Sequence, residues 1–303
     1  MQSGPSKFKR AKGASSKMKQ IPTRLSKLAV ATCILAVLAF VPELFAATDF
    51  PVPPGRAAGP ITITLGSDHN LWFTENAGLK IGRITPAGVI TEFPIAGSQG
   101  LTGITSGPDG NLWFTDEFAG KIGRISTTGT GLATFSLPTN SHPQGITAGP
   151  DGNLWFVDQT QSVSAIGGAF KIGKITLGGQ ITEYTTGINA GVFDAENYYP
   201  AQITKGPDGN LWFTNPQAGG VGKNLVGKMT VAGAVTIYPT GDTPFAITAG
   251  PDGNLWTLES GNVAKITTSG VETEYPLTQG VGMELPPARM GIFGLPRRAD
   301  LLM

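Results

Sequence analysis

The sequence contains very little cysteine, histidine or charge. With one cysteine, Cys33, it has no partner for an intrachain disulfide, and its two histidines do not form a His-Glu-x-x-His metal motif. Charged residues make up 14% of the 303 residues and the formal net charge is +1, which argues against nucleic acid as a partner. No stretch has sustained helical periodicity. These absences favour a β-rich protein that depends on packing for its stability.

The first 47 residues differ in composition from the rest. Residues 7–27 carry eight basic and no acidic side chains, and Leu28–Val41 is a run of 14 apolar or small residues. A basic segment, a short apolar core and small residues at Ala46 and Ala47 are typical of a secretory signal. The run is shorter than the roughly 20 residues of a bilayer span. Because Phe45 is a poor residue before a cleavage site, 1–47 is expected to be either a signal peptide or an uncleaved anchor. Export to the periplasm or outside the cell follows, with membrane contact only through that anchor.

All five tryptophans occur in copies of one phrase, Pro-Asp-Gly-Asn-Leu-Trp-Phe-Thr or a close variant. They are Trp72, Trp113, Trp155, Trp212 and Trp256, separated by 41, 42, 57 and 44 residues. A recurrence near forty residues is the mark of a repeat architecture.

Each repeat can be divided into four short strands. An apolar segment leads to Asp-Gly, a strong hairpin signal, and then to a strand rich in aromatic and β-branched residues. Lys121–Ile125 and its counterparts give a third strand, and Ile90–Pro94 is an example of the fourth. Four antiparallel strands per forty residues predict an all-β propeller.

Five repeats run from about Gly59 to Leu277, so we expect a propeller domain over 48–277. Thr48–Val52 resembles the fourth-strand sequence and predicts an outer strand for the last blade. Residues 278–303 contain no Asp-Gly turn and no tryptophan. We expect a non-repeat tail there, and a ring that either lacks C-terminal blades or closes unusually.

Strand order assigns the connections to two faces. The ends of the second strands and the loops between blades share the face that carries most sequence variation, including long insertions at Gln159–Phe170 and Gly187–Tyr199. Because loops on a rigid scaffold carry function, we expect a small-molecule or peptide ligand on this face. The aspartates of the Asp-Gly turns, on the other face, are interpreted as turn formers only.

The second strands predict an acidic rim on the ligand face. Its members are Glu75, Asp116, Glu117, Asp158, Asn215 and Glu259. Two interpretations are open: solvated loop carboxylates or partners of the repeated lysines, and ligands of a hard cation.

Other candidates lie in the loops between blades. His142, in Ser141-His142-Pro143, enters the third blade on the ligand face, although a lone loop histidine is more often structural. Tyr198, Tyr199 and Phe245 occupy equivalent loops and are candidates for an apolar substrate-binding pocket.

The repeated Gly-Pro-Asp-Gly-Asn-Leu-Trp-Phe-Thr, Lys-Ile-Gly-Arg-Ile-Thr and Ile-Thr-Glu-Phe-Pro segments resemble the streptogramin B (virginiamycin B) lyase family over 48–277. The resemblance implies a seven-bladed propeller. It also implies an enzyme that opens a cyclic depsipeptide by elimination at its ester bond, without water and with Mg²⁺. The chemistry needs a base for the proton alpha to a carbonyl, and a metal at the developing enolate.

The implied site residues match this chain poorly. The resemblance implies a catalytic histidine directly after a loop proline, and a metal-side glutamate four residues after a blade tryptophan. Glu117 has that offset from Trp113, but Gln144, Ala201 and Phe245 follow the loop prolines. His142 and Glu117 are therefore the candidate catalytic residues, and Glu117 and Asp158 the candidate Mg²⁺ ligands.

Two functions remain open from the sequence. One is a lyase acting on a cyclic or ester-linked substrate. The other is an exported, non-catalytic binding propeller that uses the variable loops.

Overall fold

The protein is represented by a computed structural model that describes residues 50–51, 59–160, 169–189, 201–216 and 224–277. These residues form twenty β-strands and no helix, and all twenty strands belong to one compact unit of the chain. The predicted signal or anchor (1–47), Tyr198, Tyr199 and the tail at 278–303 lie outside the described residues. Within the described ranges, no helix has the length and hydropathy needed to cross a bilayer.

The strands form five sheets of four. Blade 1 contains β1 (Pro60–Leu65), β2 (Leu71–Glu75), β3 (Lys80–Ile84) and β4 (Ile90–Pro94); blade 2 contains β5 (Leu101–Ser106), β6 (Leu112–Asp116), β7 (Lys121–Ile125) and β8 (Ala133–Ser136); blade 3 contains β9 (Pro143–Ala148), β10 (Leu154–Gln159), β11 (Ala169–Ile175) and β12 (Ile181–Asn189); blade 4 contains β13 (Ile203–Lys205), β14 (Leu211–Asn215), β15 (Leu225–Met229) and β16 (Val235–Pro239); blade 5 contains β17 (Pro244–Ala249), β18 (Leu255–Glu259), β19 (Asn262–Ile266) and β20 (Glu272–Pro276).

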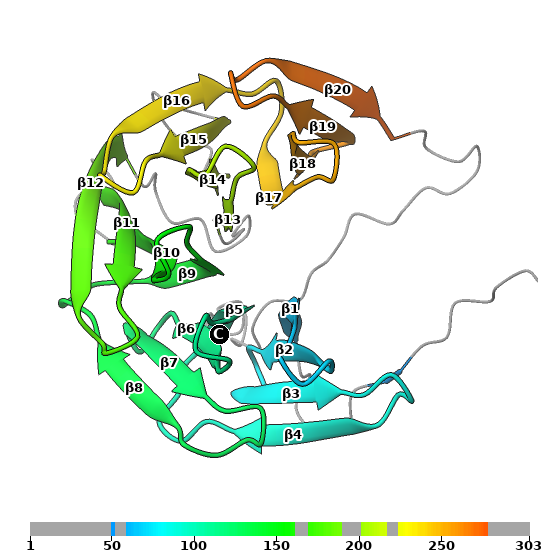
Figure 1. Ribbon diagram of the computed structural model, residues 1–303, viewed down its shortest axis with the longest axis vertical. Helices are drawn as coiled ribbons and strands as arrows, with labels where there is room; N and C mark the ends of the chain where they lie inside the picture. Colours follow the sequence, from blue (N-terminus) through cyan, green and yellow to red (C-terminus); the bar gives the residue numbers. More distant parts are fainter. Residues whose placement is uncertain (1–49, 52–58, 161–168, 190–200, 217–223, 278–303) are drawn as a thin grey trace, which may run out of the picture. The chain divides into compact units, whose positions relative to one another are not determined.

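Within each blade the strands pair antiparallel in sequence order, and the blades follow one another around a ring (Figure 1). The prediction of an all-β propeller with five four-stranded blades is confirmed. Blade 5 takes its four strands from consecutive sequence, and Phe50 and Pro51 are not in a strand. The predicted outer strand over Thr48–Val52 is therefore wrong for the two of its residues that the structure describes.

Each Asp-Gly turn is tied to the tryptophan that follows it. In blade 3, Asp151 Oδ1 accepts a hydrogen bond from Trp155 Nε1 (2.8 Å) and Asp151 Oδ2 accepts one from Asn153 Nδ2 (2.9 Å). The same pair of bonds recurs at Asp68, Asp109, Asp208 and Asp252. The interpretation of these aspartates as turn formers is confirmed, because Oδ1 of each also accepts the backbone N–H two residues on. The hydrogen bond to the indole N–H is a second structural role that the sequence analysis did not predict.

The tryptophan ring joins the turn to the outer strands of its blade. Trp155 stacks on Tyr184 of β12 with ring centroids 5.5 Å apart, and Lys174 Nζ of β11 lies 5.3 Å from the indole centroid. Four of the five tryptophans have no exposed surface, and only Trp256, in blade 5, is partly exposed.

A phenylalanine ring lies directly over a glycine on the neighbouring strand in blades 1 to 4. In blade 3, Phe156 of β10 pairs with Gly173 of β11, and a Cβ at Gly173 would lie 2.1 Å from the ring. In blade 5, Thr257 pairs with Ala264 at the equivalent positions. The glycine is therefore required for space, and the repeat changes both members of the pair together.

The hydrophobic core lies between successive blades. Trp72 of blade 1 packs in one cluster with Leu112 and Phe114 of blade 2, and the later blades repeat this contact. Leu112 lies on the face of blade 2 that packs against the preceding blade. The corresponding face of blade 1 carries Ile63 and Leu65, whose side chains are exposed. Blade 1 thus has an uncovered apolar face among the described residues, just as Trp256 is incompletely covered on blade 5.

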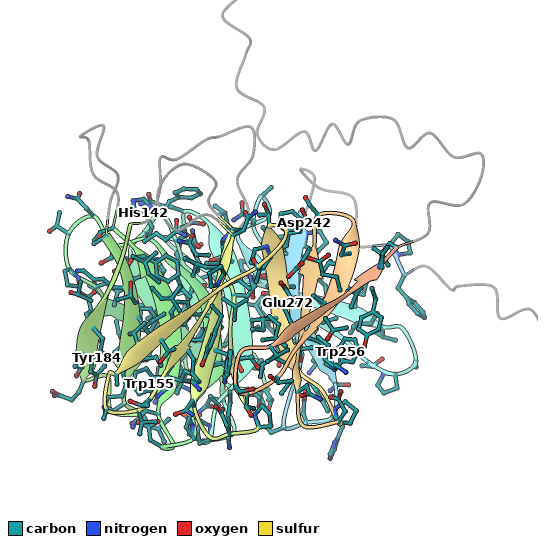
Figure 2. All side chains as sticks on the ribbon, turned by 90° about the horizontal axis from the view of Figure 1, so that it is seen from above. His142, Trp155, Tyr184, Asp242, Trp256 and Glu272 are labelled. Atoms are coloured by element: carbon teal, nitrogen blue, oxygen red, sulfur yellow. The ribbon has the colours of Figure 1, made fainter. Side chains whose placement is uncertain are left out.

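The two faces of the propeller separate as predicted. His142 and Asp242, in the loops that enter blades 3 and 5, lie on one side of the sheets (Figure 2). Trp155 and Tyr184 lie towards the other side, where the Asp-Gly turns are.

Candidate functional site

The rim residues lie at the ends of the second strands, as the sequence predicts, but they are buried. All six members of the rim have 0–4% of their surface exposed. Lys80 pairs with Glu92 and Lys171 pairs with Glu183, both on the fourth strand of their blades. The interpretation of the rim as solvated loop carboxylates is therefore wrong. Lys80 and Lys171 form their ion pairs with the fourth strand, and Lys80 also interacts electrostatically with the rim residue Glu75.

Two rim carboxylates hold the loops that enter their own blades. Asp158 Oδ1 accepts a hydrogen bond from the backbone N–H of His142 (2.7 Å), and Asp116 Oδ1 accepts two, from Gln99 and Gly100 (3.0 Å each). Burial raises the pKa of Asp158 to about 6. These aspartates fix the backbone of the ligand face, and Asp158 positions the loop that carries His142.

Gln144 connects three blades on the same face. Its Nε2 donates to Glu117 Oε1 of blade 2 (3.3 Å), and its Oε1 accepts the backbone N–H of Ala201, which precedes blade 4 (2.7 Å). The carbonyl of Gln144 also accepts a hydrogen bond from Thr115 Oγ1 (2.5 Å). Gln144 and Glu117 are each 1% exposed. Their pairing is a buried link between blades.

His142 is the one described histidine on this face, because His69 is an exposed residue of the blade 1 turn, where it stands in place of the glycine of the four Asp-Gly turns. The imidazole packs edge-on against Phe118, with ring centroids 6.1 Å apart, beside the segment that carries Glu117. Its Nδ1 is buried and has no hydrogen-bond partner in the described parts of the chain. Burial lowers the pKa of His142, so the ring is neutral at pH 7 and can accept a proton.

The predicted apolar pocket is only partly described. Phe245 is half-buried in β17 of blade 5, two blades away from His142 in the ring. Tyr198 and Tyr199 lie outside the described residues.

Glu117 and Asp158 do not by themselves make a Mg²⁺ site. Neither belongs to a group of three or more acidic, histidine or cysteine ligands in the part of the chain that the structure describes. One oxygen of each already accepts a hydrogen bond, from Gln144 and from His142. Since Mg²⁺ requires near-octahedral oxygen coordination, we derive no chemical step through a metal at these residues.

The fold and the site can now be compared with known proteins. The sequence profile of the virginiamycin B lyase family matches residues 50–283. The chain belongs to the virginiamycin B lyase family.

Solved structures of the virginiamycin B lyase family agree with this assignment. Selenomethionine-substituted virginiamycin B lyase from Staphylococcus aureus is 34% identical, covers 78% of this chain and 76% of its own, and has a TM-score of 0.64. A catalytically inactive histidine-to-alanine variant of virginiamycin B lyase from Staphylococcus aureus, with quinupristin, is 33% identical over 77% of this chain and 75% of its own (TM-score 0.62). A putative gluconolactonase at 15% identity covers 80% of this chain and 84% of its own (TM-score 0.55), which shows the fold alone. No curated protein matches the chain.

The chain departs from the virginiamycin B lyase family pattern at the loop proline. The resemblance implies a histidine after that proline, and in blade 3 this position holds Gln144, whose side-chain amide is held at both ends. An amide does not accept a proton at neutral pH, so Gln144 cannot act as the base. The only imidazole in this loop is His142, two residues earlier.

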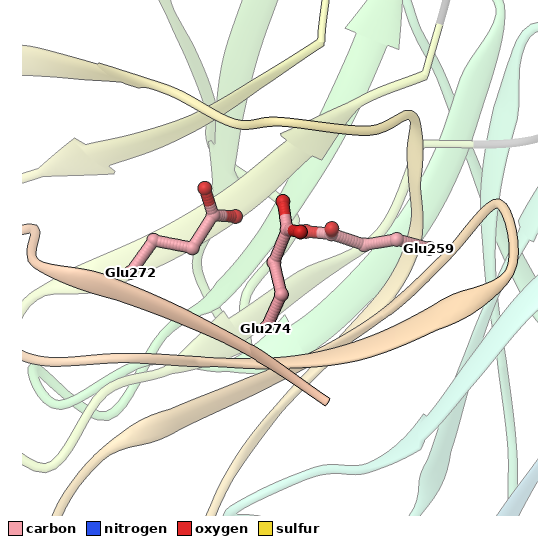
Figure 3. Close-up of side chains that lie close together, drawn as sticks. All are labelled: Glu259, Glu272 and Glu274. Carbon is pink, nitrogen blue, oxygen red and sulfur yellow. The ribbon is translucent and has the colours of Figure 1, made fainter. Parts of the chain in front are cut away.

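Sequence reasoning missed an acidic cluster in blade 5 that the virginiamycin B lyase repeat does not predict. Carboxylate oxygens of Glu259, Glu272 and Glu274 all lie within 4.8 Å of one another (Figure 3). Burial, followed by the nearby Glu272 carboxylate, raises the pKa of Glu259 to about 7. The sequence does carry a signal, because Asn262 stands where blades 1, 2 and 3 have lysine.

The raised pKa of Asp158 predicts how stability depends on pH. The folded state binds this proton more tightly than the unfolded chain, so the contribution of Asp158 to stability is fully present below about pH 4 and is lost as the pH rises to about 6. Asp158→Asn, which copies Asn215 of blade 4, removes this dependence. The free energy of unfolding of the variant, relative to that of wild type, should increase by on the order of 1–3 kcal/mol when the pH is raised from 4 to 7. Urea unfolding of both proteins in EDTA at pH 4 and at pH 7 measures this change. If variant and wild type differed by the same free energy at both pH values, the prediction would be wrong.

Proposed function

We propose that the protein binds a cyclic depsipeptide of the streptogramin B type on the ligand face and opens its ester by elimination, with His142 as the base. The observation that carries the proposal is a neutral, half-buried imidazole with an unpartnered Nδ1 on the variable-loop face of a virginiamycin B lyase family propeller. The proposal includes export, which rests on residues 1–47. Finding the chain in the periplasm or culture fluid would test that part.

The reaction balances without water. The His142 imidazole takes the proton alpha to the carbonyl, the bond between the neighbouring carbon and the ester oxygen breaks, and the electron pair leaves with the carboxylate. The product is a linear isomer with a new carbon–carbon double bond. By resemblance to the family, a bound Mg²⁺ would supply positive charge for the developing enolate, and a comparison of rates in Mg²⁺ and EDTA tests whether it takes part.

The chain's own residues would orient and restrain this base. Asp158 fixes the backbone N–H of His142, and Phe118 packs against the ring. Both contacts limit the orientations of the imidazole ring, which favours a single approach by the substrate.

A second candidate function is binding without chemistry. The specific observation in its favour is Gln144, a non-basic residue after the loop proline that joins Glu117 to Ala201. In that case the ligand face would capture a peptide or small molecule and release it unchanged.

One experiment separates these functions. The purified chain is incubated with quinupristin in Mg²⁺ or EDTA and analysed by liquid chromatography with mass spectrometry. Elimination gives a new peak of unchanged mass, whereas hydrolysis, as expected of a lactonase, adds one water. We expect the isomeric product, and a loss of at least about 100-fold in rate for His142→Ala.

His69→Gly is the matched control, because it replaces the other histidine by the residue that the other four turns carry. It should retain full activity. Binding of quinupristin with no product at high protein concentration would exclude the lyase proposal and support the binding function.

A further inference from the structure

Lysine supplies a cation at one recurring position of the propeller. The third strand carries a lysine opposite the last rim residue of the second strand in blades 1, 2 and 3, and in two of these the ammonium pairs with a glutamate on the fourth strand. In blade 3, Lys171 Nζ lies 2.8 Å from Glu183 Oε2. The repeat therefore places a positive charge between the third and fourth strands, next to the end of the second.

Blade 5 keeps the acidic groups and loses the lysine. Glu274 occupies the position of Glu183, Glu259 the position of Asp158, and Asn262 the position of the lysine. Glu272 adds a third carboxylate, where blades 1 and 3 have isoleucine. Blade 4 has no charge at these positions, because Asn215, Leu225 and Ile237 replace the second-strand carboxylate, the lysine and the fourth-strand glutamate. Blade 5 alone concentrates three carboxylates at this position without a lysine.

The cluster lies on the face of blade 5 that packs against blade 4. Leu255 and Ile266, on the same face of blade 5, pack with Trp212 and Val226 of blade 4. The loop that follows blade 4 closes over the carboxylates, since the N–H of Gly241 donates to Glu272 Oε2 (3.1 Å). Glu259 is therefore buried at an interface between described blades, whereas Glu272 is partly buried and Glu274 is exposed.

Two buried oxygens in this cluster have no hydrogen-bond donor. Glu259 is 2% exposed, and only its Oε1 is satisfied, by Thr257 Oγ1 (2.9 Å). Glu259 Oε2 and Glu272 Oε1 are buried and without a hydrogen-bond partner in the described residues. The side-chain nitrogen of Asn262 donates instead to Asp242 (2.7 Å). A buried carboxylate oxygen left without a partner is costly, and either a bound cation or a proton shared between Glu259 and Glu272 would satisfy these two.

We propose that Glu259, Glu272 and Glu274 bind one hard divalent cation, Ca²⁺ in preference to Mg²⁺, in the place that lysine occupies in blades 1 to 3. Ca²⁺ takes oxygen ligands at about 2.3–2.6 Å, so a single ion reaches oxygens up to about 5 Å apart. The carboxylate oxygens lie within 4.8 Å of one another, inside this range without rearrangement. The ion crosslinks the second and fourth strands of blade 5 under the loop from blade 4. This site shares no residue with the candidate catalytic set.

Calorimetric titration of the EDTA-treated full chain with CaCl2, with MgCl2 as a parallel titration, tests the proposal. We expect about one Ca²⁺ per chain and weaker Mg²⁺ binding. Thermal unfolding in millimolar Ca²⁺ should show a midpoint raised by about 3–5 °C.

Asn262→Lys is the decisive variant, because it rebuilds the lysine of blades 1 and 3 and is expected to fold. It should be more stable than wild type in EDTA and should lose the response to Ca²⁺. Glu272→Ile, which restores the isoleucine of blades 1 and 3, should weaken Ca²⁺ binding at least tenfold, whereas Glu92→Gln in blade 1 should leave it unchanged.

Three outcomes would overturn the proposal. Absence of any Ca²⁺ binding by wild type would mean that Glu259 and Glu272 are held together by a shared proton instead. Equal Ca²⁺ binding by wild type and Asn262→Lys would place the ion elsewhere. Loss of the response in Glu92→Gln would show that the effect is not specific to blade 5.

Discussion

Replacing Trp155 by alanine is expected to destabilise the protein by about 3–5 kcal/mol, and replacing Trp256 by alanine to cost about half of that or less. Trp155 has no exposed surface, donates its indole N–H to Asp151 and stacks on Tyr184. Its removal opens a cavity between blades 3 and 4 and leaves a turn carboxylate without its donor. Trp256 makes the same bond to Asp252 and stacks on Tyr275, but its ring is partly exposed, so less packing is lost.

Urea unfolding of the two variants and wild type, followed by far-UV circular dichroism, gives the comparison. Asp151→Asn is the milder comparison, since it keeps the oxygen that accepts the indole hydrogen bond and loses only the acceptor of Asn153 Nδ2, so it should cost about 0.5–1.5 kcal/mol. Equal losses for Trp155→Ala and Trp256→Ala would show that packing between blades does not determine the contribution of the tryptophans.

The second large effect concerns the contact of Phe156 with Gly173. Gly173→Ala is expected to destabilise the protein by about 1–3 kcal/mol, because the new Cβ would lie 2.1 Å from the Phe156 ring. Phe156→Thr alone should cost about 3–5 kcal/mol through the cavity that it leaves. The double variant copies Thr257 and Ala264 of blade 5. It should be more stable than the sum of the single losses by at least about 1 kcal/mol.

Gly178→Ala is the control for the glycine substitution. This glycine lies in a turn of the same blade, and a Cβ there would meet only Thr176 Oγ1, at 3.8 Å. Its free energy of unfolding should change by less than about 0.5 kcal/mol. Additive losses in the double variant would contradict the steric coupling of the pair.

The sequence predicts this fold well, because every repeat contains the local signals for its own strands and turns. The Asp-Gly turn, the Trp-Phe strand and the alternating outer strand each rest on local chemistry, and five copies place them in register. The hydrogen bond from each tryptophan to its turn aspartate could not be predicted in the same way. It depends on the side-chain conformation that brings the indole N–H next to the turn, and residue spacing alone does not determine that conformation.

The candidate site was less predictable. The ends of the second strands were placed correctly, yet Glu75 and Asp158 were as compatible with solvent as with burial, because charge alone does not report what covers a side chain. Gln144 was noticed only as a residue that lacks an imidazole, and its contacts with Glu117 and Ala201 join residues 27 and 57 positions away. The blade 5 cluster was missed because its signal is a comparison between repeats, with Asn262 in place of lysine.

The packing between blades also determines how this protein comes apart. The contacts between sheets join neighbours in the sequence, so stability is distributed along a row of coupled units instead of in one central core. Among the described residues, blade 1, with Ile63 uncovered, and blade 5, with Trp256 partly uncovered, receive less support from neighbouring blades than the three blades between them. Opening by fraying therefore starts at these two blades, while blade 3, which carries His142, opens last. An ion held between strands of blade 5 would act at one of the two places where unravelling begins.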